Sequence, residues 1–254
     1  MLNIIEHGSA SGVPLLIVHG LYGSARNWGV IAKRLADQRH VIAVDLRNHG
    51  ESDWAAPHTY PAMAEDLRAV VQHFGGRADM IGHSMGGKAA MVLALQTPQM
   101  LRRLVVADIA PVAYSHSQMQ YIDAMRAVDL ARVTKRADAM AQLADHVDDP
   151  VLQSFFTQSL DVAGKRWRLN LDQLAQNMAD ILSFPEVSGQ FANPTLFLTG
   201  AQSEYVLPEH RPTIRALFPK ARFAKLQGAG HWLHAEKPRE FEASVRAFLA
   251  ASDD

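Results

Sequence analysis

The pentapeptide Gly-His-Ser-Met-Gly at positions 82–86 restricts the possible folds more than any other part of the sequence. It separates an apolar run at 78–81, expected to be a strand, from the run 87–95, which has the composition of a helix. A Gly-x-Ser-x-Gly sequence between a strand and a helix is typical of a nucleophile elbow, where the serine occupies a sharp, strained turn. Glycines two residues on either side prevent collisions with the neighbouring strand and helix. We therefore expect the Ser84 hydroxyl to project from a sheet beside free N–H groups at the start of a helix.

Short apolar strands alternate with helical patterns along most of the chain. The expected strands lie at 15–18, 41–44, 78–81, 104–107, 195–199 and near 222–227, and the expected helices between and after them at 27–35, 60–74, 87–95, 208–218 and 239–250. Continuously apolar strands are typical of parallel sheets covered by helices on both faces. The pattern predicts an α/β protein with a doubly wound, mostly parallel sheet.

The segment 112–185 differs from the rest because its amphipathic patterns are all helical. They fall near 118–130, 135–147, 150–160 and 171–183, and a basic break at 165–168 indicates a hairpin or turn. We predict a core formed by 1–111 and 186–254, with 112–185 as a helical cap inserted between strands. Such a cap would cover the carboxyl ends of the strands, where ligands bind in sheets of this kind.

The composition excludes several classes of protein. The 254 residues carry a formal net charge of −1 and contain no cysteine, which argues against a nucleic-acid partner, a thiolate nucleophile and a cysteine-ligated metal. The first eight residues lack the features of a signal peptide, and no run approaches the ~18 apolar residues of a membrane helix. We expect a cytoplasmic monomer or homodimer with no membrane partner.

A serine hydroxyl needs a base to take its proton before it can attack a carbonyl carbon. His231 is the best candidate, since it follows the last expected strand in the tight sequence Gly-Ala-Gly-His at 228–231. Because the chain has 12 histidines, a surface or packing role is the plain alternative. We expect His234 to pack locally, and His19 and His83 to orient the loops that flank the site.

The order of these motifs allows a resemblance to be stated. His-Gly-x-x-Gly at 19–23, Gly-x-Ser-x-Gly at 82–86, a helical insertion and Gly-x-Gly-His at 228–231 resemble the α/β-hydrolase superfamily over the whole chain. More narrowly, the sequences at 45–50, 82–88, 108–111 and 230–238 look like those of small bacterial YbfF-type esterases. The resemblance implies the α/β-hydrolase fold and a catalytic triad that needs no metal or organic cofactor.

The third member of that triad is the unusual feature. Members of the superfamily usually carry an Asp after the strand that here is 195–199, but Ser203 stands in that place. A neutral hydroxyl cannot stabilise the imidazolium of His231. Asp108, at the end of strand 104–107, is our preferred acid, with Glu204 as the alternative. Without such a role, Asp108 would cap the turn before Pro111.

The resemblance also indicates the other parts of the site. The oxyanion hole would use the backbone N–H groups of Leu21 and Met85. The candidate pocket residues are Tyr22, Tyr114, Tyr205 and Trp232. We expect Lys88 to pair with a buried carboxylate in a structural role, with contact to a ligand as the alternative. We expect the cluster at 47–49 to hold its loop in place, with a role in substrate binding as the alternative.

These features predict a serine hydrolase that cleaves ester or acyl thioester bonds of small to medium apolar acyl groups. The possibility of thioesters comes from the resemblance to YbfF-type esterases. Two alternatives use the same triad, namely a cofactor-free haloperoxidase or perhydrolase and a hydrolase of carbon–carbon bonds. A dehalogenase is disfavoured, because it would need Asp in place of Ser84. From another class, a ligand-binding module without turnover would keep the fold but lose the chemistry.

Overall fold

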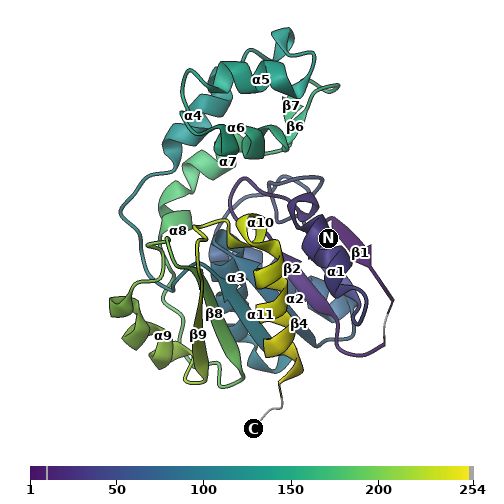
Figure 1. Ribbon diagram of the computed structural model, residues 1–254, viewed down its shortest axis with the longest axis vertical. Helices are drawn as coiled ribbons and strands as arrows, with labels where there is room; N and C mark the ends of the chain where they lie inside the picture. Colours follow the sequence, from purple (N-terminus) through teal and green to yellow (C-terminus); the bar gives the residue numbers. More distant parts are fainter. Residues whose placement is uncertain (10, 252–254) are drawn as a thin grey trace.

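The computed structural model describes residues 1–9 and 11–251 of the chain. Within them, the main sheet has the strand order β1-β3-β2-β4-β5-β8-β9 (Figure 1). Its neighbouring strands are parallel, except that β1 runs antiparallel to β3. The strands are β1 (Ile4–His7), β2 (Leu15–Val18), β3 (Val41–Val44), β4 (Ala78–His83), β5 (Leu101–Ala107), β8 (Thr195–Gly200) and β9 (Ala221–Leu226).

Helices cover both faces of this sheet, and this explains why its inner strands are continuously apolar. Leu15 and Ile17 of β2 pack in one cluster with residues of α1 (Gly29–Leu35) and α11 (Pro238–Ala250). Leu16 and Val18, which point to the opposite face, belong to a second cluster with α2 (Tyr60–His73) and α3 (Met85–Gln96). Side chains alternate across a strand, so each run of four apolar residues supplies both clusters. The doubly wound α/β architecture is confirmed.

The structure differs from the prediction at several elements. The strand β1 was not predicted; it is an antiparallel edge strand whose four residues are mostly half-buried. The one-turn helix α10 (Leu233–Glu236) was not predicted either. The two helices expected at 27–35 and 208–218 begin as 3₁₀ turns, η1 (Ala25–Trp28) and η4 (Pro208–His210), and η4 continues into α9 (Arg211–Leu217). A further short turn, η2 (Pro98–Met100), joins α3 to β5.

Residues 112–185, which we call the cap segment, contain helices and one small hairpin. The elements are α4 (Met119–Ala127), η3 (Leu130–Arg132), α5 (Arg136–Leu143), α6 (Pro150–Thr157), β6 (Leu160–Asp161), β7 (Arg166–Trp167), α7 (Leu171–Gln176) and α8 (Met178–Leu182). The second strand of the hairpin β6–β7 lies within the predicted break at 165–168, and the first strand lies before it. In Figure 1 α4 to α7 lie above the sheet, with α8 between them and the core. The division into a core and this cap remains our proposal for the domain organisation.

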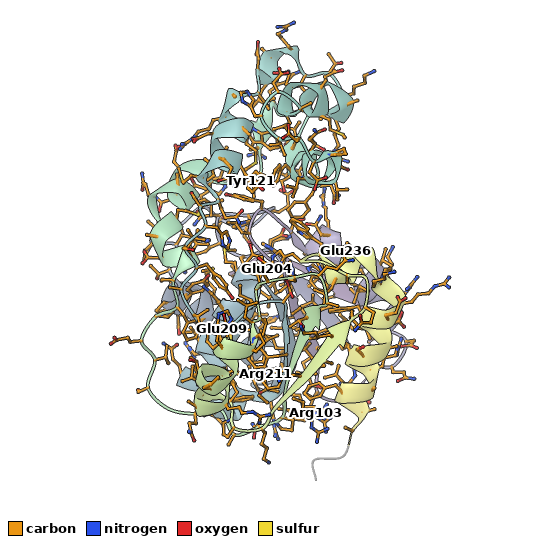
Figure 2. All side chains as sticks on the ribbon, turned by 60° about the vertical axis from the view of Figure 1, so that its left-hand side comes forward. Arg103, Tyr121, Glu204, Glu209, Arg211 and Glu236 are labelled. Carbon is orange, nitrogen blue, oxygen red and sulfur yellow. The ribbon has the colours of Figure 1, made fainter. Side chains whose placement is uncertain are left out.

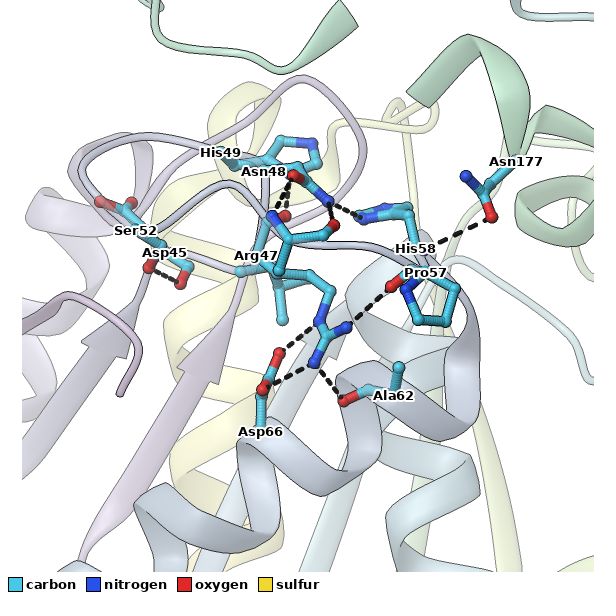
Figure 3. A network of polar contacts seen from close by, with 12 residues as sticks. Asp45, Arg47, Asn48, His49, Ser52, Pro57, His58, Ala62, Asp66 and Asn177 are labelled. Carbon is cyan, nitrogen blue, oxygen red and sulfur yellow. Dashed lines mark hydrogen bonds and ion pairs between the residues drawn. The ribbon is translucent and has the colours of Figure 1, made fainter. Parts of the chain in front are cut away.

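A polar network at 45–58 holds the loop after β3 and joins it to the cap segment (Figure 3). Arg47 donates two hydrogen bonds to Asp66 of α2, at 2.6 and 2.9 Å. The carbonyl and side-chain oxygens of Asn48 accept from Asn170 of the cap segment, at 2.9 and 3.0 Å. These contacts agree with the expected role of the cluster at 47–49 in holding its loop. Through Asn48 they also attach this loop to the cap segment. None of the helices in 1–9 and 11–251 has the length and apolar character needed to cross a membrane.

Candidate active site

Ser84 lies at the junction of β4 and α3 in a strained backbone conformation, with φ 50° and ψ −122°. The two glycines of the motif are required by close backbone contacts. A Cβ atom at position 82 would lie 2.5 Å from the Gly86 carbonyl oxygen, and one at position 86 would overlap the carbonyl oxygen of His19. The chain therefore approaches itself on both sides of Ser84, as expected for an elbow.

His231 connects Ser84 to Asp108 through its two ring nitrogens. Its Nε2 lies 3.1 Å from the Ser84 hydroxyl oxygen, and its Nδ1 lies 2.7 Å from Oδ2 of Asp108. Because a carboxylate only accepts hydrogen bonds, Nδ1 carries the proton and Nε2 is free to accept from the hydroxyl. This is the tautomer that a general base for Ser84 requires.

Asp108 is fully buried at the end of β5, with a positive φ of 52°. Besides His231, its carboxylate accepts hydrogen bonds from the Gly200 N–H at 3.0 Å and from the Ser203 hydroxyl at 2.5 Å. Glu204 instead is exposed, one residue beyond Ser203 in the loop after β8 (Figure 2). The geometry thus favours Asp108 over Glu204.

The hydrogen bond from Ser203 to Asp108 was not foreseen. In the sequence, Ser203 stands out only as the place where an acid is missing. In the structure the serine side chain lies at the usual position of the acid and orients the carboxylate that comes from the neighbouring strand β5. Ser203 takes the place of the Asp in the Gly-x-x-Asp pattern, and this was the signal that could have indicated a contact with the acid.

Several groups fix the position of His231. The ring of Tyr205 stacks on its imidazole with centroids 4.0 Å apart, and Nε2–H of His83 donates to its carbonyl oxygen at 2.9 Å. Glu236 accepts the N–H groups of the two neighbouring residues, Gly230 at 2.7 Å and Trp232 at 3.2 Å (Figure 2). The role of Glu236 was not predicted, because no sequence pattern indicates that α10 folds back onto the loop of His231.

Three other histidines near the site have structural roles, in agreement with the sequence analysis. His19 Nε2 accepts the Leu46 N–H at 2.9 Å, and the ring of His234 stacks on Trp28 with centroids 4.0 Å apart. Burial lowers the pKa of His19, holds the pKa of His83 well below the ordinary value and lowers the pKa of His234 to about 3. All three are therefore neutral near pH 7.

The expected oxyanion-hole residues lie beside Ser84 on the same cavity. Met85 begins α3, so its N–H is one of the groups that lack a partner within the helix. Leu21 reaches the cavity from the loop after β2. His58 lies against the Met85 side chain, with its Nε2 3.4 Å from the sulfur, and Asn48 in turn donates to Nδ1 of His58 at 3.1 Å. The loop after β3, which contacts the cap segment through Asn48, therefore also contacts Met85.

A cavity of about 230 Å³ opens beside Ser84 and His231. Its lining includes all four predicted pocket residues, Tyr22, Tyr114, Tyr205 and Trp232. The cap segment contributes apolar walls that include Tyr121 and Phe155. Figure 2 shows Tyr121 among the side chains of the upper part of the molecule, above the position of Glu204. The cavity is small, lies between core and cap segment, and combines apolar walls with a few polar groups at Ser84, as ligand sites commonly do.

Lys88 departs from the prediction. Instead of pairing with a buried carboxylate, its ammonium donates to the backbone carbonyls of Leu182 at 3.1 Å and Ser183 at 2.5 Å. It also lies 4.7 Å from the ring centroid of Tyr114, in a cation–π contact. The role is structural, as expected, but its partners are main-chain and aromatic groups.

The fold and the Ser84–His231–Asp108 arrangement are those of a hydrolase of the α/β class, and the comparisons with known proteins agree. The family model of the alpha/beta hydrolase fold matches residues 13–238. The chain is 40% identical to a mouse (Mus musculus) protein, sn-1-specific diacylglycerol lipase ABHD11, over 98% of this chain and 84% of that protein. It is 37% identical to Esterase YbfF of Escherichia coli (strain K12), over 93% and 92% of the two chains.

A solved structure is also closely similar. The solved structure described as a marine microorganism esterase has a TM-score of 0.91 and 35% sequence identity, with 97% of this chain and 98% of that chain covered. The protein belongs to the α/β-hydrolase fold family, and its relatives of this similarity include esterases and lipases.

Proposed function

We propose that this protein is a serine hydrolase that cleaves carboxylic ester bonds through an acyl-enzyme on Ser84. The observation that carries the proposal is the continuous set of hydrogen bonds from Ser84 through His231 to the buried Asp108. Nucleophile, base and orienting acid are all within hydrogen-bonding distance. The esterase and lipase names of the relatives support the same reaction class.

The proposed mechanism gives each group one step. The Ser84 oxygen attacks the carbonyl carbon of the ester while Nε2 of His231 takes the hydroxyl proton. The tetrahedral oxyanion is stabilised by the N–H groups of Leu21 and Met85, and Asp108 stabilises the imidazolium. The C–O bond to the alcohol then breaks as His231 returns the proton to the leaving oxygen. Water, deprotonated by His231, attacks the acyl-enzyme and releases the carboxylic acid and free Ser84.

The cavity supports a preference for small to medium apolar acyl groups. Its volume is about 230 Å³, and its walls combine aliphatic and aromatic side chains from the core and cap segment. A relative named as a diacylglycerol lipase makes glycerol esters one class to test. Acyl thioesters are a second class that the same triad could cleave, since attack, oxyanion and acyl-enzyme are alike for both.

The test is hydrolysis of p-nitrophenyl esters from acetate to decanoate by wild type, Asp108→Asn and the matched control Glu204→Gln. We expect Asp108→Asn to lower kcat by up to ~10⁴, the loss seen when a triad Asp becomes Asn and His takes the wrong tautomer. Glu204→Gln should remain near wild type, because Glu204 is exposed and Asp108 already occupies the position beside His231.

The opposite ranking of these two variants would disprove the choice of acid. If wild type cleaves no ester or thioester, reaction of Ser84 with a fluorophosphonate probe separates two cases. A labelled but inactive protein would indicate a different acyl or carbon–carbon substrate on an intact triad. A protein that is neither labelled nor active would support the binding-module alternative and reject the hydrolase.

A further inference from the structure

Lys88 is a buried cation on the helix that carries the nucleophile. It lies one helical turn after Ser84 on α3, it is 1% exposed, and it lines the same cavity. Within 1–9 and 11–251 no carboxylate lies at ion-pair distance from it. The hydrogen bonds given for its ammonium in the described part of the chain go to neither Ser84 nor His231. Burying a charge without a counterion costs free energy, so the groups that stabilise the Lys88 ammonium need to be identified.

The partners of Lys88 are the two connections between the core and the cap segment. On the exit side, the ammonium donates to the carbonyls of Leu182 and Ser183, at the end of α8. On the entry side, it lies against the ring of Tyr114. The N–H of Tyr114 donates to the same Leu182 carbonyl at 2.9 Å, so the two connections also contact each other. One side chain of the catalytic helix thus holds both places where the chain enters and leaves the cap segment.

We propose that Lys88 is a positioning residue that ties both connections of the cap segment to α3 and thereby sets the shape of the acyl cavity. The cavity is lined by Tyr114, Ile181 and Leu182 on this side, so loosening their attachment would alter the surface that a longer acyl chain contacts. This reading of the cavity rests on the proposed ester hydrolysis. The tether itself does not depend on the reaction.

The tether is also sensitive to pH. Burial lowers the pKa of Lys88 to about 7. The titratable groups around it are Tyr60 of α2, Tyr114 and His116 of the entry connection, and Asp180 of α8, which acts on Tyr60. A neutral amine donates weaker hydrogen bonds and loses its attraction to an aromatic ring. The tether should therefore be strong below pH 7 and weaker above it.

The first experiment is hydrogen–deuterium exchange, followed by mass spectrometry, on wild type, Lys88→Met and the control Lys33→Met. Lys33 is an exposed lysine within helix α1, far from the connections in sequence. Exchange at 110–118 and 178–185 should be about tenfold faster in Lys88→Met, because charge-assisted hydrogen bonds are among the stronger ones. It should be unchanged in Lys33→Met. Equal exchange in Lys88→Met and wild type would overturn the inference, whatever the protein hydrolyses.

The second readout is the ratio of kcat/KM for p-nitrophenyl decanoate to that for the acetate. A change in the triad itself would affect both esters alike and cancel in this ratio. For Lys88→Met we expect the ratio to fall about tenfold, mostly through a higher KM for the decanoate, since the cavity wall and not the triad has changed. A ratio equal to that of wild type would contradict the link to the cavity. Changed exchange in a protein that cleaves no ester would leave the tether in place and reject the proposed function.

If Lys88→Met does not fold, the same exchange can be measured on wild type alone at several pH values. The exchange rate at 110–118 and 178–185 is divided by the rate in α11, because this removes the base catalysis common to all amides. The resulting ratio should rise with pH around a midpoint near 7. A ratio that is flat from pH 6 to 8.5 would reject the pH dependence of the tether without any variant.

Discussion

At the scale of single residues, Ser84 and Asp108 both hold backbone conformations that side chains rarely adopt, with φ of 50° and 52°. Such conformations cost on the order of 1–3 kcal/mol each and persist only where the surroundings fix them. For Ser84 the close backbone contacts of Gly82 and Gly86 do so. For Asp108 the Gly200 N–H and the Ser203 hydroxyl hold the carboxylate. These strained conformations direct the Ser84 hydroxyl and the Asp108 carboxylate toward His231 from the ends of neighbouring strands.

Replacing Ser203 with Ala tests the hydrogen bond to Asp108. The variant keeps the carboxylate but lets it turn, so His231 is oriented less well. We expect kcat to fall about tenfold with little change in KM. The reason is that a hydrogen bond to a charged group contributes ~1.5–3 kcal/mol at most. Ser203→Thr, which retains the hydroxyl, is the control. Steady-state kinetics on p-nitrophenyl butyrate measures both, and an unchanged kcat in Ser203→Ala would show that the bond has no part in catalysis.

At the scale of elements, the site depends on how closely β2, β4 and α3 approach one another. The chain at Gly86 runs directly against the carbonyl of His19 at the end of β2, and no side chain fits between them. Leu21 and Met85, which neighbour these two positions in the chain, line the same cavity as Ser84. Strands β2 and β4 pair with Val18 opposite Gly82, and this register sets the distance between His19 and Gly86.

A pair of glycine substitutions tests this close contact. Gly86→Ala places a methyl group against main-chain atoms that cannot move aside, so we expect a loss of ~1–3 kcal/mol or more from overpacking, and a loss of Ser84 reactivity. Gly29→Ala is the control. It lies in α1 at φ −55° with no atom within 4 Å of the added Cβ, and it should stabilise the protein by ~0.4–1 kcal/mol. Urea unfolding and fluorophosphonate labelling measure these effects. Equal stability of the two variants would contradict the structure.

At the scale of the whole molecule, the buried histidines link folding to pH. Burial lowers the pKa of His19, keeps those of His49 and His83 well below the ordinary value, and lowers those of His58 and His234 to about 4 and about 3. In the unfolded chain each would titrate near its ordinary value of 6.5. Between these values the unfolded state binds more protons than the folded state, so the free energy of unfolding falls as the pH falls below 6.5.

We therefore expect loss of stability in mild acid. Each such histidine contributes up to ~1.4 kcal/mol per pH unit to the slope once its unfolded form is protonated. Urea unfolding at pH 7, 6 and 5 measures this slope. His234→Phe keeps a ring against Trp28 and should reduce the slope by about one histidine's share, ~1.4 kcal/mol per pH unit. The control His146→Phe, at an exposed position, should leave it unchanged. A slope unaffected by His234→Phe would show that His234 does not contribute.

The sequence by itself determined the alternation of apolar strands and helices, the elbow at 82–86 and the late histidine at 231, because each signal lies within a few consecutive residues. It missed β1 and α10, which are short and have no strong apolar pattern, since their formation depends on the elements they contact. Only the tertiary structure brought Asp108 to hydrogen-bonding distance from His231, made Ser203 a donor, and gave Lys88 two carbonyls in place of a carboxylate. These contacts join residues about 90 to 120 positions apart, and residue types do not encode which distant groups the packing of strands and cap segment will bring within hydrogen-bonding distance.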